Sequence, residues 1–270
     1  MTGRSQASRL QRLTDAITER DQQLLAEIER LRLVTGGQLA RLFFAASPSA
    51  ASGARACRKQ LSRLSELGVV EALPRPVGGV RGGSRGTIWR ITSEGRRLNA
   101  WRRGEPLPAR RSRYVAGSGH QRHTLGLAEL SVRLCEADRA DQLELLEHQA
   151  EPACWRSFAT GYGGLGQLKP DAFVRLGIGE WEQLAFVELD RGTEGSSALE
   201  RKVEAYLAYG RSGAEQQQYG VFPQVVWLTA TERRRAQLRQ LLPRAAASGE
   251  VTFIVGAASD AITVLAGATA

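Results

Sequence analysis

Cysteines, lysines and long apolar runs are all scarce in this sequence. Its three cysteines, Cys57, Cys135 and Cys154, lie far apart without metal-ligand spacing, which argues against a disulfide scaffold and predicts buried thiols in a reducing compartment. No stretch approaches the roughly 18 consecutive apolar residues of a membrane span, and the N-terminus lacks an apolar signal core. We therefore expect a cytoplasmic protein without a membrane partner.

The composition is that of a globular chain. The sequence has 270 residues, of which 42% are hydrophobic and 24% charged, and this balance excludes disorder as the main state. The length is enough for two small domains, each with its own core.

Lysine occurs only three times, and arginine supplies nearly all the positive charge. Residues 1–122 hold 23 Lys and Arg against 9 Asp and Glu, whereas residues 123–270 hold 14 against 19. A basic N-terminal half with arginine's planar donor fork favours a polyanionic partner, above all nucleic acid. Coding bias toward arginine is the alternative explanation of the composition.

The basic half predicts three helices and a hairpin. Thr18 with Asp21, and Thr35 with Gln38, have capping-box spacing at the start of two short helical patterns. A third helix is expected over residues 53–67, with Gly68 after its end. Its apolar side chains (Cys57, Leu61, Leu64 and Leu67) fall on one side, and its basic side chains (Arg55, Arg58, Lys59 and Arg63) recur elsewhere.

A strand over residues 69–73 and a partner over residues 87–91 follow, joined by a Gly-rich loop with Arg81 and Arg85. Three helices and such a hairpin make a winged helix-turn-helix, whose third helix reads the DNA major groove. The ending Thr92-Ser93-Glu94-Gly95 is similar to that of winged-helix regulators. The predicted DNA contacts are Arg55, Arg58, Lys59, Arg63, Arg81 and Arg85. Protein contact is the alternative role, since winged helices also serve it.

The acidic half alternates strands and helices. A helix over residues 123–136 precedes a strand at 142–147, a strand entered from Asp171, a strand over 184–190, a helix over 197–209 and strands at 225–229 and 251–255. Because side chains alternate along a strand, Glu188 and Asp190 project from one face. With Asp171 on the neighbouring strand, they are candidates to converge on a divalent cation.

Pro170-Asp171, then a hairpin, then Glu188-x-Asp190 resembles the PD-(D/E)xK restriction-endonuclease-like fold. Together with the winged helix and a following helix that bears Lys202 and Tyr206, the chain more specifically resembles the replication-relaxation family of plasmid and mobile-element proteins. The resemblance covers about residues 18–256. We therefore expect an α/β (α+β) protein: a flexible N-terminus at 1–17, a winged helix at 18–100, an Arg-, Pro- and Gly-rich linker at 101–119, a nuclease-like domain with a mixed sheet at 120–256, and a tail at 257–270.

The nuclease resemblance implies a conditional catalytic set of Asp171, Glu188, Asp190 and Lys202. Asp171, Glu188 and Asp190 would hold Mg²⁺ or Mn²⁺, and the metal would activate water. Asp190 stands where the nuclease pattern has lysine, so Lys202 on the next helix is the candidate replacement, and Glu129 the candidate additional helix acid. The alternative is that these acids only form ion pairs.

Three functions stay open at this point. The first is a DNA-binding protein that controls replication, relaxation or transfer of a mobile element, with double-stranded DNA, a relaxase or replication protein, and a second copy of the chain as candidate partners. The second is a metal-dependent endonuclease, and the third is a one-component regulator that senses a ligand.

Overall fold

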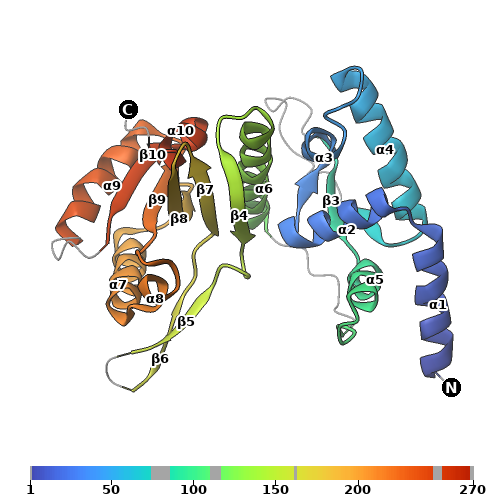
Figure 1. The fold of residues 1–270 in the computed structure, drawn as a ribbon, viewed down its shortest axis with the longest axis horizontal. Coiled ribbons are helices and arrows are strands. Elements are labelled where there is room, and N and C mark those ends of the chain that lie inside the picture. Colours follow the sequence, from blue (N-terminus) through green and yellow to red (C-terminus); the bar gives the residue numbers. More distant parts are fainter. Residues whose placement is uncertain (1, 74–85, 110–116, 161–162, 246–250, 268–270) are drawn as a thin grey trace. The chain divides into compact units, whose positions relative to one another are not determined.

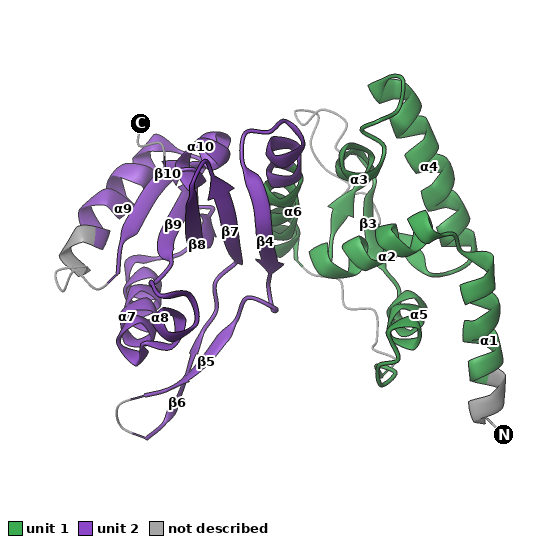
Figure 2. Cartoon of the chain, viewed as in Figure 1, with its two compact units in different colours: residues 1–132 green, residues 133–270 purple. Residues whose placement is uncertain are grey.

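The computed structural model describes residues 2–73, 86–109, 117–160, 163–245 and 251–267. The chain forms two compact units, residues 1–132 and 133–270 (Figures 1 and 2). The boundary falls inside helix α6 (Ser118–Arg139) rather than in the expected linker. The reason is that the first half of α6 belongs to the first unit: Ala128 is fully buried in its core.

The first unit fits a winged helix. Its three-stranded antiparallel sheet has the order β1-β3-β2. Its elements before α6 are α1 (Thr2–Ala16), α2 (Glu19–Leu31), β1 (Val34–Thr35), α3 (Gly36–Phe43), α4 (Ala50–Glu66), β2 (Val70–Ala72), β3 (Ile88–Ile91) and α5 (Ser93–Arg103). The wing loop, with Arg81 and Arg85, lies outside the described residues.

Helix starts in this unit follow the predicted capping chemistry. Thr18 and Thr35 are N-caps of α2 and α3, with the reciprocal hydrogen bonds to Asp21 and Gln38 that the spacing predicts. Helix α4 begins three residues earlier than expected because Ser49 forms its own capping box. Gly68 follows α4 with a φ of 73°, the conformation that favours glycine there.

Two helices of this unit were not predicted. Residues 1–17, expected to be flexible, contain α1, since Leu10 and Leu13 are buried in the core. Helix α5 starts from the N-cap Thr92 at the end of the predicted winged helix. Gly95 in its first turn lies so close to the residue before β2 that an added Cβ would be 2.2 Å from the Val69 carbonyl oxygen. The Thr92–Gly95 pattern therefore marks a helix that packs tightly on the sheet.

The second unit is an α/β sandwich around a five-stranded mixed sheet of order β10-β9-β8-β7-β4. Strands β4, β7 and β8 are antiparallel, whereas β8, β9 and β10 are parallel. Its elements are β4 (Glu144–Ala150), β5 (Arg156–Ala159), β6 (Leu165–Leu168), β7 (Ala172–Ile178), β8 (Trp181–Asp190), α7 (Ser196–Ser212), α8 (Ala214–Tyr219), β9 (Gln224–Thr229), α9 (Glu232–Ala245), β10 (Phe253–Ala257), the 3₁₀ helix η1 (Ala258–Asp260) and α10 (Ala261–Leu265).

The predicted fold class, a mixed α/β chain with a central mixed sheet, is confirmed. One face of the sheet packs against α7 and α9 around Phe173, Phe186 and Trp227. Strands β5 and β6 form a separate hairpin. Residues 257–270, expected as a tail, include α10, where Ala261 and Leu265 are buried. Within the described ranges, no helix is long and apolar enough to cross a membrane.

Candidate functional site

Helix α4 presents exposed cations on the side away from its core. Arg55, Arg58 and Lys59 are exposed, while Cys57, Leu61 and Leu64 are fully buried beneath them. In the part of the chain that the structure describes, none of these three cationic side chains has an ion pair or a hydrogen bond to another side chain. A helix surface with uncompensated positive charge is suited to phosphate and base-edge contact.

A cavity of about 570 Å³ lies beside this surface. Arg58 and Ser62 of α4 line it together with Gly36 and Gly37 at the start of α3, and with Thr87 and Trp89 at the start of β3. The exposed face of α4 therefore borders a hollow rather than a flat surface.

Arg63, which the sequence groups with the other cations of α4, has a different environment. Its guanidinium forms an ion pair with Asp21, whose side chain is fully buried, and donates to the Ala16 carbonyl oxygen at 3.1 Å. Thr18 and Gln60 also donate to Asp21. Burial alone would raise the pKa of Asp21, but these hydrogen bonds outweigh it and lower the pKa. Arg63 thus has a structural contact that the other three lack.

A buried polar centre lies in the second unit, at the face of β8 that α7 covers. Glu188 is 1% exposed; its Oε1 accepts a hydrogen bond from the Tyr206 hydroxyl at 2.5 Å. Its Oε2 is 2.5 Å from the Lys202 Nζ, an ion pair outside ideal hydrogen-bond geometry. The structure therefore brings Lys202 to Glu188, as expected from its position on the helix.

Asp171 belongs to the same centre. Its Oδ2 accepts from the backbone N–H of Leu189 at 2.7 Å. Burial raises the pKa of Glu188 above its usual value; the Lys202 ammonium opposes this shift and the Asp171 charge adds to it. The two carboxylates hold the pKa of Lys202 above its usual value even though burial acts in the other direction. The ammonium is therefore the stable charge of this centre.

Asp190 does not join this centre. Its Oδ2 accepts from the Arg234 Nε at 2.8 Å, and its Oδ1 accepts from the Gly192 backbone N–H. The Arg234 side chain, on α9, is only 13% exposed. Helix position alone provides no signal for this partner, because the pairing joins residues 44 positions apart.

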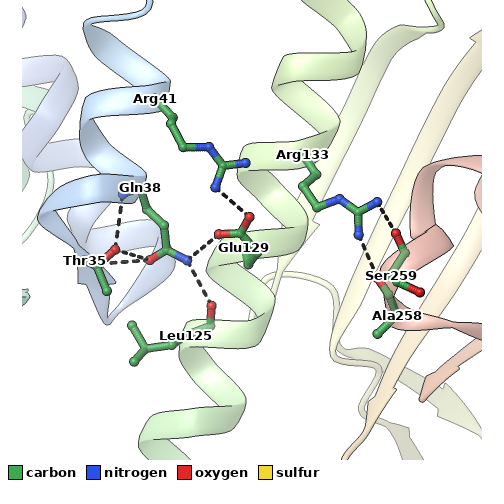
Figure 3. A network of polar contacts seen from close by, with 8 residues as sticks. All are labelled: Thr35, Gln38, Arg41, Leu125, Glu129, Arg133, Ala258 and Ser259. Carbon is green, nitrogen blue, oxygen red and sulfur yellow. Dashed lines mark hydrogen bonds and ion pairs between the residues drawn. The ribbon is translucent and has the colours of Figure 1, made fainter. Parts of the chain in front are cut away.

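Glu129, the candidate additional acid, forms its contacts within the first unit instead. Its carboxylate accepts from Arg41 Nη1 at 2.6 Å and from Gln38 Nε2 at 3.0 Å, both on α3 (Figure 3). One helical turn later, Arg133 donates to the carbonyl oxygens of Ala258 and Ser259 (Figure 3). These polar residues of α6 serve the packing of each unit.

The carboxylates do not fit a Mg²⁺ or Mn²⁺ site as arranged. Glu188 already has Tyr206 on one oxygen and the Lys202 ammonium at the other. Asp190 is ion-paired with Arg234. Among the described residues, no three His, Cys, Asp or Glu side chains form a group that could hold a metal ion. The predicted ligand set of Asp171, Glu188 and Asp190 is thus not brought together in the geometry that such an ion needs.

One chain thus combines a first unit that fits a winged helix with a second unit built around a mixed sheet. The family model described as Replication-relaxation matches residues 25–225, which is most of both units. The chain belongs to the replication-relaxation family. For this member of the family, no curated protein and no solved structure gave a match.

Proposed function

We propose that this replication-relaxation protein binds double-stranded DNA through the exposed face of α4 and acts in the replication, relaxation or transfer of a plasmid or other mobile element. Membership of the family supports the biological setting. The second unit, whose element order resembles the PD-(D/E)xK fold, acts in this proposal as a non-catalytic domain.

The observation behind the proposal is the contrast along α4. Arg55, Arg58 and Lys59 are exposed cations without described partners, whereas Arg63 is neutralised by Asp21. The third helix of a helix-turn-helix is the one that enters the major groove. Unpaired charges at this position favour nucleic acid over a role confined to protein contact.

The test is DNA binding by the full chain, measured by fluorescence anisotropy over a series of salt concentrations. Replacement of Arg55, Arg58 and Lys59 by alanine should lower the affinity and reduce the slope of log K against log salt by about 0.9 for each phosphate that the variant no longer neutralises. A matched control replaces Arg201, Arg211 and Arg233, three exposed arginines of the second unit, and should leave both quantities unchanged.

Equal loss of affinity in both triple variants would show a general charge effect and contradict the proposal. If DNA affinity is unchanged after the α4 substitutions and circular dichroism confirms the fold, the DNA-binding surface does not include this helix face.

A metal-dependent endonuclease is the second candidate, because Lys202 does reach Glu188. Incubation of the same protein with supercoiled DNA in Mg²⁺, Mn²⁺ or EDTA distinguishes it. We expect binding without cleavage. Metal-dependent nicking that disappears in Asp171→Asn would establish the enzyme instead.

A further inference from the structure

The buried polar centre of the second unit contains negative charge that needs a counter-charge, and it plays no part in the proposed DNA binding. Glu188 is almost completely buried, and Asp171, with 9% exposure, accepts a hydrogen bond at 2.7 Å from the backbone N–H of Leu189, the residue after Glu188. Two buried carboxylates without compensation are costly in an apolar interior. Such a pair needs a proton, a metal ion or a cationic side chain.

We infer that Lys202 is the resident cation of this centre, and that its ammonium occupies the place in which Asp171 and Glu188 would otherwise take up a divalent metal ion. The Nζ lies 2.5 Å from Glu188 Oε2. It is therefore within the contact shell where a cation bound to that oxygen would have to lie.

Helix α7 and strands β8 and β9 hold the ammonium in place, β8 through Glu188. Helix α7 positions Lys202 and, one turn later, Tyr206, whose hydroxyl occupies the other oxygen of Glu188. On β9, Trp227 pairs directly with Glu188 in the sheet register, and its ring lies 5.5 Å from Nζ. The cation is thus fixed by an ion pair on one side and an aromatic face on another.

The same arrangement opposes a second cation. A divalent ion at Glu188 would have to displace Lys202 Nζ or tolerate its positive charge at contact distance, and it would compete with Tyr206 for the remaining oxygen. Removal of the ammonium takes the cation away from Glu188 Oε2 and leaves an acidic, oxygen-rich environment of the kind that Mn²⁺ and Mg²⁺ prefer. The inference concerns the second unit alone and does not depend on DNA binding.

The experiment compares full-length wild type with Lys202→Ala. Mn²⁺ binding is counted by electron paramagnetic resonance of the free ion, and Tm is followed by calorimetry with Mn²⁺ or EDTA. Wild type should bind no Mn²⁺ at this centre and keep the same Tm in both conditions. Lys202→Ala should lose roughly 10 °C in Tm in EDTA, gain one Mn²⁺ site and recover part of the Tm with the metal.

Lys169→Ala is the matched control, since Lys169 is an exposed lysine of the same unit whose ammonium lies over the ring of Trp155. It should gain no Mn²⁺ site.

If Lys202→Ala does not fold, the double variant Lys202→Met with Glu188→Gln keeps the test open, because removing both charges should restore a folded protein. A stoichiometric Mn²⁺ site in wild type, or a Lys202→Ala protein with unchanged Tm and no added site, would overturn the inference. Failure of the double variant to fold would do the same.

Discussion

Arg63 and its partner Asp21 show that the spacing of a charged residue along a helix can predict the wrong role for it. Arg63 has the spacing of a DNA contact, yet its guanidinium meets the buried carboxylate of a residue 42 positions earlier. Sequence periodicity describes one helix at a time, so it does not reveal a partner on another helix. The same limit applies to Asp190 and Arg234.

The two kinds of arginine on α4 should therefore separate in experiments. Arg63→Ala should lower the free energy of unfolding by about 2 kcal/mol, because it leaves Asp21 buried without its cation. Arg58→Ala, from the exposed face, should change it by less than about 0.5 kcal/mol while weakening DNA binding. Urea unfolding and anisotropy on the two variants check both effects; a larger stability loss in Arg58→Ala would contradict them.

Asp21 should also make stability depend on pH. Its pKa in the folded protein is below the ordinary value of 3.8, so the ionised form is favoured more in the folded chain than in the unfolded chain. The contribution to stability is present above pH 3.8 and is lost as the pH falls through the folded-state pKa. The stability difference between wild type and Asp21→Asn should thus be larger at about pH 7 than at about pH 3, as measured by urea unfolding. An equal difference at both values would contradict this.

At the scale of elements, helix starts and the succession of the sheet's strands along the chain were predictable because their signals are local. Thr18 and Thr35 mark helix starts through contacts three residues away, and Glu188 and Asp190 share a face because of strand alternation. Helices α1 and α5 were missed because their burial depends on packing against distant segments. In the candidate site, the pairing of Lys202 with Glu188 was anticipated, but the separation of Asp190 was not.

The close approach of α5 to the backbone at Val69 gives a prediction at this scale. Gly95→Ala should destabilise the first unit by about 2 kcal/mol or more, since the added Cβ would overlap the backbone at Val69. Gly37→Ala in α3 is the control: the nearest atom to its added Cβ is 3.9 Å away, so the change should stay within about 1 kcal/mol. Similar losses in both variants, measured by urea unfolding, would show that the close approach at Gly95 is tolerated.

At the scale of the whole molecule, the boundary of the first unit lies within α6 and not in the linker that the composition predicts. The first unit needs the part of α6 that contains Ala128 and Glu129. A fragment of residues 1–139 should therefore have a higher Tm than one of residues 1–119, because the shorter fragment exposes core and removes the carboxylate that Arg41 pairs with. Calorimetry of the two fragments checks this, and equal Tm values would place the boundary back in the linker.

The scarcity of lysine gives this chain a built-in chemical reporter. An amine-reactive reagent meets three lysines in three environments: Lys59 exposed on α4, Lys169 exposed beside Trp155, and Lys202 half-buried and ion-paired with Glu188. Acylation needs the neutral amine, so Lys202 should react slowest. Bound DNA should shield Lys59 and leave Lys169 as an internal standard, so peptide mass spectrometry could follow DNA occupancy without any added label.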